Sequence, residues 1–263
     1  MAFTQDPDTQ NIENPYGVVF PPGDLLSDEP PLESELHLRQ IMLLIQCLER
    51  WWHDRQDFYA CGNMTIYYSP RQRKSEQFRG PDFFVVKETE RKPRKSWVVW
   101  QEGGKYPNVI VEILSPATAS TDRGLKKQIY QDIFRTPEYF WFDPESMEFQ
   151  GFQLIAGAYE PLQPDENGWL WSPQLGLFLG IYNSKLRFFT PEGQRVLSPE
   201  EASAWEGERA EQEHQRAEQE HQRAEQEHQR AEQERQRAEQ ERQRADRLAE
   251  RLRQLGIAPE EVE

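Results

Sequence analysis

Two apolar runs of the chain each carry a single carboxylate, and each run has the pattern of a buried strand. The first run is residues 81–86 (PDFFVV) and the second is residues 109–114 (VIVEIL). An acid inside a strand that is buried on both faces is costly unless a cation, a proton or a hydrogen-bond donor compensates it. Neighbouring strands can bring Asp82 and Glu112 to a shared point, which is how Mg²⁺ is usually held. The pattern therefore predicts a divalent-metal site.

The hydrophobic pattern around these runs predicts an α/β core. Dense apolar positions over about 33–52 indicate a buried helix, and Thr121 or Asp122 can cap a second helix over about 122–135. The expected order is helix, three strands, helix, strand, and the last three elements have the form of a parallel crossover. We expect the core strands at 63–68, 81–86, 109–114 and 138–142, with additional β strands at 149–155, 159–162, 175–179 and 186–189.

The last part of the chain is a charged heptad repeat. From Arg209 the sequence reads RAEQEHQ three times and then RAEQERQ twice. Alanine is the only apolar residue of each repeat, which predicts a long exposed helix, on the order of 70 Å, whose seam is too thin for strong dimerisation. Its best contacts fall near the end, at Leu248, Leu252 and Leu255. We expect three segments: an extended or disordered lead-in (1–32), a core domain (33–205) and a helical arm (206–263).

Charge and composition narrow the classes of protein. The net charge of −15 argues against broad nucleic-acid affinity, because phosphate binding draws on Lys and Arg. Nine basic residues nevertheless lie between 71 and 95, so either a cation-rich rim beside Asp82 or a solvated loop is expected. The chain has two cysteines, Cys47 and Cys61, and no apolar run of membrane-spanning length. We expect a soluble, cytoplasmic protein with no membrane association.

Four segments between about residues 30 and 195 carry a resemblance to a known family. They are residues 81–82 (PD), 111–116 (VEILSP), 122–126 (DRGLK) with Tyr130, and 138–144 (EYFWFDP). In this order and spacing they resemble the PD-(D/E)XK nuclease superfamily, and more closely its Uma-two-type branch of restriction-endonuclease-like proteins, abundant in cyanobacteria. The resemblance implies a restriction-endonuclease-like fold and a hydrolase, a metal-dependent endonuclease acting on DNA.

The resemblance also implies roles for individual residues. Asp82 and Glu112 would hold Mg²⁺ or Mn²⁺, and Glu33 on the first helix would be a third acid for the metal. In the superfamily pattern a lysine follows the second acid by two residues, whereas this chain has Leu114 there. The branch places its lysine on the following helix, which points to Lys126.

Lys126 lies four residues after Asp122 and four before Tyr130, so the three share one helix face. Lys126 is thus expected to be catalytic, with Asp122 and Tyr130 supporting it. The missing lysine and the acidic net charge favour an alternative from another class. In it the nuclease-like domain is degenerate, and the chain is an interaction or scaffold protein that acts through its helical arm. A homo-oligomer, through the core or the distal helix, is left open.

Overall fold

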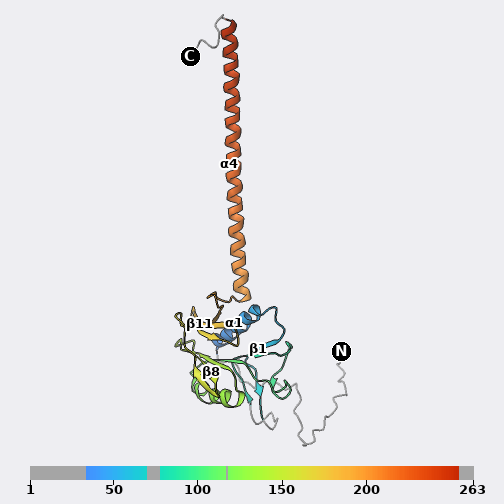
Figure 1. Ribbon diagram of the computed structural model, residues 1–263, viewed down its shortest axis with the longest axis vertical. Helices are drawn as coiled ribbons and strands as arrows, with labels where there is room; N and C mark the ends of the chain where they lie inside the picture. The colour runs from blue at the N-terminus through green and yellow to red at the C-terminus, as the bar shows by residue number, and fades with distance from the viewer. Residues whose placement is uncertain (1–33, 70–77, 117, 255–263) are drawn as a thin grey trace, which may run out of the picture. The chain divides into compact units, whose positions relative to one another are not determined.

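The computed structural model describes residues 34–69, 78–116 and 118–254 (Figure 1). The predicted lead-in and Glu33 lie outside these residues, as do Leu255 and the cations Arg71, Arg73 and Lys74. None of the helices in the described ranges is both long and apolar enough to cross a bilayer.

A six-stranded sheet forms the centre of the fold. Its strand order is β1-β4-β6-β7-β8-β9, and β6 and β7 are the parallel pair, with Val109 opposite Glu138 and Ile113 opposite Phe142. The other neighbours are antiparallel. This is the predicted α/β order of helix, three strands, helix, strand, extended by additional β strands. The six strands are β1 (Phe58–Gly62), β4 (Phe83–Lys87), β6 (Val109–Ile113), β7 (Glu138–Phe142), β8 (Phe149–Ile155) and β9 (Ala158–Pro161).

The first strand of this sheet differs from the prediction. The sheet uses β1, whereas the run predicted at 63–68 contributes only β2 (Ile66–Tyr67), which pairs with β3 (Phe78–Arg79) and β5 (Trp97–Val98) in a separate small sheet. The chain turns between β1 and β2 at Asn63, whose φ is +48°. Gly62 also permits close packing, because a Cβ there would lie 2.2 Å from a methyl carbon of Ile41. The small residues Ala60 and Gly62 weaken the strand pattern of β1, so the sequence analysis did not predict this strand.

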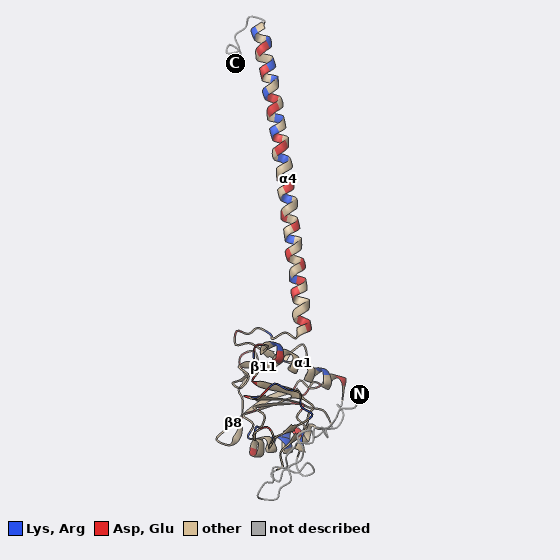
Figure 2. Ribbon diagram, turned by 90° about the vertical axis from the view of Figure 1, so that its right-hand side faces the viewer, with Lys and Arg blue, Asp and Glu red and all other residues tan. Residues whose placement is uncertain are grey.

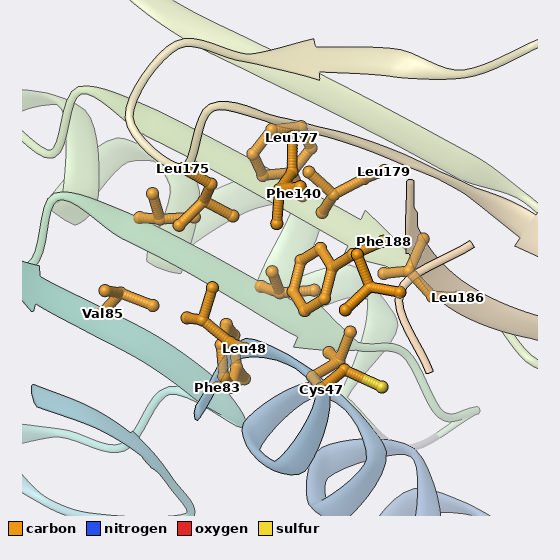
Figure 3. Packing of buried hydrophobic residues seen from close by; sticks show 14 of the residues in the cluster. Cys47, Leu48, Phe83, Val85, Phe140, Leu175, Leu177, Leu179, Leu186 and Phe188 are labelled. Carbon is orange, nitrogen blue, oxygen red and sulfur yellow. The ribbon is translucent and has the colours of Figure 1, made fainter. Parts of the chain in front are cut away.

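Helix α1 (Glu35–Trp51) covers one face of the sheet. Ser34 caps it by accepting the His37 N–H at 3.2 Å, and its buried stripe includes Ile41, Leu44 and Leu48. Figure 3 shows Cys47 and Leu48 of α1 meeting side chains of β4, of β7 and of a second three-stranded sheet, among them Phe83, Phe140 and Phe188. That sheet consists of β10 (Leu170–Ser172), β11 (Leu177–Tyr182) and β12 (Lys185–Phe189). One buried core therefore lies between α1, the central sheet and β10–β12, and a second buried core includes Trp97, Tyr130 and Tyr139.

The helical connection between β6 and β7 is not a regular α-helix. It consists of α2 (Ala119–Thr121), a π-helical turn η1 (Asp122–Lys126), α3 (Lys127–Ile129) and a second π-helical turn η2 (Tyr130–Phe134). The connection starts earlier than predicted, because the Ser115 hydroxyl accepts the Thr118 N–H at 3.2 Å. It ends at Arg135, whose φ of +55° is left-handed. π-Helical turns inside helices are rare and occur frequently at functional sites.

The C-terminal helix α4 (Pro199–Gln254) is 56 residues long, which corresponds to roughly 84 Å. It starts seven residues before the predicted arm, and the chain divides into two compact units between Glu200 and Glu201. Acidic and basic residues are interspersed along its length (Figure 2). Almost every residue of α4 is exposed, as the repeat predicts.

Glu138, at the start of β7, is a buried acid whose ionisation should make the stability of the protein depend on pH. Its carboxylate is fully buried, where it accepts hydrogen bonds from the Ser172 hydroxyl and from the Gln174 N–H at 2.9 Å. Burial raises the pKa of Glu138 to about 7 despite these donors. Because the folded state holds the proton more tightly, stability should fall as pH rises from about 4.5 to 7, by roughly 3 kcal/mol at most.

Glu138→Gln, which stays neutral, should flatten this part of the pH profile and be the more stable protein at pH 8. Urea unfolding at pH 5 and pH 8 measures both effects. Glu160→Gln, on the exposed edge strand β9, is the matched control and should follow the wild type. An identical pH profile for Glu138→Gln and the wild type would contradict the assignment.

Candidate active site

Asp82 and Glu112 meet at one end of the β4–β6 pair. The Asp82 N–H donates to Glu112 Oε2 at 3.2 Å, and Asp82 Oδ2 accepts the Ile113 N–H at 2.7 Å. The antiparallel register sets Phe83 opposite Val111, so the residues just outside that pair, Asp82 and Glu112, face each other. The structure thus brings together the two acids that the apolar runs single out.

Lys126 reaches this pair of acids from the helical connection. Its Nζ lies 3.2 Å from Glu112 Oε2 and 2.8 Å from Asp122 Oδ1, and 16% of its side chain is exposed. Burial alone would lower the pKa of Lys126, but Glu112, Asp122 and Asp82 together raise it above its usual range. The ammonium group therefore stays charged and lies among the three carboxylates.

Glu112 is the most deeply buried member of the site, with no exposed surface. Burial raises its pKa well above the ordinary value, and Asp82 and Asp122 raise it further, while Lys126 and the Tyr130 hydroxyl oppose the shift. Tyr130 donates to Glu112 Oε1 at 2.7 Å. Burial and the neighbouring acids therefore disfavour the charged form of Glu112, and further positive charge close by would favour it.

Asp122 is also buried, and burial raises its pKa although Lys126 opposes the shift. The Tyr139 hydroxyl donates to the Asp122 backbone carbonyl at 2.9 Å and so fixes the first π-helical turn. Of the two residues expected to support Lys126, Asp122 contacts the lysine, whereas Tyr130 contacts Glu112 instead.

His37 is a member of the site that the sequence analysis did not select. Its Nε2 lies 2.9 Å from Asp82 Oδ1, and only 7% of the residue is exposed. With Ile113 on the other oxygen, both carboxylate oxygens of Asp82 are held. The available signal was its place on the buried stripe of α1, three residues before Gln40 and four before Ile41.

Leu114 occupies the position at which the superfamily pattern has a lysine, and its surroundings in the structure are apolar. Side chains alternate along a strand, so a lysine at 114 would point to the same face as Glu112. Leu114 instead is 2% exposed and packs in an aromatic cluster with residues such as Tyr139 and Trp141. The cation near Glu112 comes from Lys126 instead, through the first π-helical turn.

The described part of the basic segment is largely neutralised by local partners. Arg94 pairs with Glu102 at 2.6 Å, Arg91 pairs with Glu49 at 2.7 Å, and Lys92 pairs with Glu90 at 3.0 Å. The Lys87 ammonium donates to the backbone carbonyl of Gln174 at 3.0 Å. These contacts do not favour a cation-rich rim among the described residues, and Arg94 is buried in its ion pair rather than solvated.

The acids of the site fit a hard divalent cation through their charge. Three carboxylates lie close together at this site, those of Asp82, Glu112 and Asp122. Lys126 is the cation beside them, and it contacts Glu112 and Asp122 directly. Mg²⁺ keeps several waters and commonly uses only one or two protein carboxylates. Across residues 34–69, 78–116 and 118–254, no group of three or more His, Cys, Asp or Glu side chains has the arrangement of a complete metal centre. A two-carboxylate site at Asp82 and Glu112 is what the donors allow.

Comparison with known proteins places the chain in a family. No curated protein matches it. One solved structure, described as a putative nuclease belonging to DUF820 from Anabaena variabilis, is similar with a TM-score of 0.42 and 12% sequence identity, over 56% of this chain and 76% of that one. A sequence model of the Uma2 family, described as "Putative restriction endonuclease", matches residues 14–183. Because this match covers more than half of the chain, the protein belongs to the Uma2 family of restriction-endonuclease-like proteins.

Proposed function

We propose that the protein is a divalent-metal-dependent endonuclease that hydrolyses phosphodiester bonds of DNA. The observation that supports this most strongly is the convergence of Asp82, Glu112 and Lys126 from three separate elements. A purely structural ion pair would need one acid for the lysine, whereas this site gathers three. Excess buried negative charge is stabilising only if a cation neutralises it.

The proposed chemistry assigns a distinct task to each side chain. Asp82 and Glu112 would hold Mg²⁺ or Mn²⁺, which supplies Lewis-acid stabilisation of the phosphoryl group and makes water more acidic. Lys126, charged and partly exposed, would stabilise the negative charge that develops on the phosphate oxygens. Tyr130 and Asp122 hold Glu112 and Lys126 in place. Membership of the family is consistent with a nuclease, and the DNA substrate and the metal are parts of this proposal.

A second candidate is a degenerate nuclease that serves as a scaffold. One observation favours it: every carboxylate oxygen of Asp82 and Glu112 already contacts a protein group. Such a closed network is also what a structural ion-pair cluster would show. The two candidates differ in one measurable respect. Only the enzyme must bind a divalent cation at Glu112, and Lys126 must then give up part of its contact with that carboxylate.

The deciding experiment uses the full-length protein. Calorimetric titration with Mn²⁺ should give one site per chain, and supercoiled plasmid should be nicked or linearised with Mn²⁺ or Mg²⁺ but not with EDTA. Binding without cleavage of plasmid, single-stranded DNA or RNA would favour the scaffold. The absence of both binding and cleavage would contradict the metal site itself.

His37 provides a more specific prediction about this site. Groups that hold a metal-binding carboxylate in place typically contribute 10–100-fold to metal affinity. We therefore expect His37→Gln to weaken Mn²⁺ binding by about that factor in the same titration. His53→Gln is the matched control, because His53 is exposed and contacts only the neighbouring Asp54 and the Arg50 carbonyl among the described residues. Unchanged affinity in His37→Gln would limit His37 to a packing role.

A further inference from the structure

The helix α4 has an uneven distribution of charge that its regular repeat conceals. Its first repeats, over residues 206–229, contain three Arg and eight Glu, a net charge of −5 with neutral histidines. The remainder of the helix, over residues 230–254, contains eight Arg against six Asp or Glu, a net charge of +2. The change arises mainly because His214, His221 and His228 are followed by Arg at the same repeat position.

The surface of α4 is available to a partner over most of its length. Every residue from 203 to 248 is exposed, and none of the residues in this stretch belongs to either buried core. The ion pair on this stretch, between Arg209 and Glu213, lies within the helix. Exposed pairs of this kind contribute only a few tenths of a kcal/mol, so they leave both charged halves free to interact with another molecule.

The repeat also has a centre of symmetry that coincides with the change of charge. Alanine recurs every seven residues at six positions, and the midpoint of this series falls between Glu227 and His228. The boundary between the acidic and basic halves follows at residue 230. Two helices aligned in opposite directions about this midpoint would therefore place alanine near alanine and each acidic half beside a basic half.

We propose that two copies of the chain associate through α4 in an antiparallel orientation. A parallel pair would set each residue beside its own copy, so Glu213, Glu220 and Glu227 would each face an identical Glu close to the seam. It would also align two halves of charge −5. The antiparallel pair removes both repulsions and sets −5 against +2 at each end, while the small alanine side chains let the helices approach closely. The proposal concerns α4 alone and does not depend on the proposed nuclease activity.

The association should be modest in affinity and sensitive to salt. Alanine buries little apolar surface, so charge contributes a large part of the attraction, and exposed charges are screened over about 10 Å at 0.1 M salt. Sedimentation of the full-length protein should show dimers that weaken at least tenfold between 50 mM and 500 mM NaCl. A monomer at every salt and protein concentration would overturn the proposal, since α4 would then not associate with a second copy.

Orientation is tested by disulfide trapping. Ala210→Cys and Ala245→Cys, made as separate full-length variants of different tag size, should form mixed disulfides when combined under mild oxidation, and each alone should form few. Parallel helices would give the reverse result and overturn the proposal. The unsubstituted protein is the control, since it keeps Cys47, which is buried, and Cys61, which is partly buried.

Exchanging charged residues between the two halves of α4 tests whether complementary charge causes the antiparallel association. Arg235→Glu with Arg242→Glu makes the distal half acidic and should weaken dimerisation at least tenfold in 50 mM NaCl. Adding Glu213→Arg and Glu220→Arg restores the original net charge of the chain. In the antiparallel alignment residue 213 faces residue 242 and residue 220 faces residue 235, so these positions again carry opposite charges and association should return. Failure of this fourfold variant to recover, with helicity intact by circular dichroism, would refute complementary charge as the source of orientation.

Discussion

Glu112→Gln should abolish Mn²⁺ binding and DNA cleavage while making the metal-free protein more stable at neutral pH. The amide keeps the size of the side chain; its oxygen can take the place of Oε2, which accepts the Asp82 N–H, and its NH2 group can donate to the Tyr130 hydroxyl in place of Oε1. It removes the negative charge that a divalent cation requires. It also removes the charge that burial, Asp82 and Asp122 disfavour at this position. Loss of function and gain of stability should therefore occur in one variant.

The direction of the stability change follows from the raised pKa of Glu112. A carboxyl group that binds its proton more tightly when folded stabilises the protein at low pH, and this contribution is lost as pH rises above about 4.5. The wild type should thus lose stability between about pH 4.5 and neutral pH in EDTA, and Glu112→Gln should lose less. Relief of one unfavourable buried charge is worth roughly 1–3 kcal/mol. Urea unfolding in EDTA at pH 5 and pH 8 measures the difference.

Two controls separate this result from a general effect of removing an acid. Glu145→Gln changes an exposed glutamate outside the site and should retain metal binding, cleavage and the wild-type pH profile. Adding Mn²⁺ should stabilise the wild type and Glu145→Gln but not Glu112→Gln, because only binding to the folded state raises stability. If Mn²⁺ stabilises Glu112→Gln as well as it does the wild type, Glu112 is not a metal ligand.

The sequence predicted the parts of this site that depend on short-range patterns. Single acids in otherwise apolar strands identify Asp82 and Glu112, since few other causes would keep a carboxylate in such a run. The spacing of four residues also predicts the contact between Asp122 and Lys126, although the segment is a π-helical turn rather than the expected α-helix. Both predictions need only the local geometry of one strand or one helix.

The features that the sequence did not predict depend on contacts between distant segments. His37 contacts Asp82 only because α1 packs across the sheet, and its place on a buried helix face is equally typical of a core histidine. Likewise, β1 contains Ala60 and Gly62, whose small side chains permit the approach of α1 but weaken any strand signal. Periodicity reports which face of an element is buried and does not report what lies against it.

Lys126→Ala should reduce DNA cleavage by roughly 10²–10³-fold, while Mn²⁺ affinity stays close to that of the wild type. The reason is that the lysine is not a metal ligand and acts on charge that develops during the reaction. The metal-free protein should lose stability, because Glu112 and Asp122 then lack their 3.2 Å and 2.8 Å contacts with a cation. The comparison is therefore made with Mn²⁺ present, and Lys126→Met, which keeps most of the side-chain volume, provides a second variant.

Lys127→Ala is the matched control from the same helical connection. The Lys127 ammonium lies 3.4 Å from the centre of the Phe152 ring, and burial lowers its pKa, so it serves a different surface from Lys126. Single-turnover cleavage at saturating Mn²⁺ should leave Lys127→Ala near the wild-type rate and both Lys126 variants far below it. If the Lys126 variants instead cleave normally and Lys127→Ala does not, the catalytic cation is the neighbouring residue. Equal activity in all the variants would leave the site without a catalytic lysine and favour the scaffold over the enzyme.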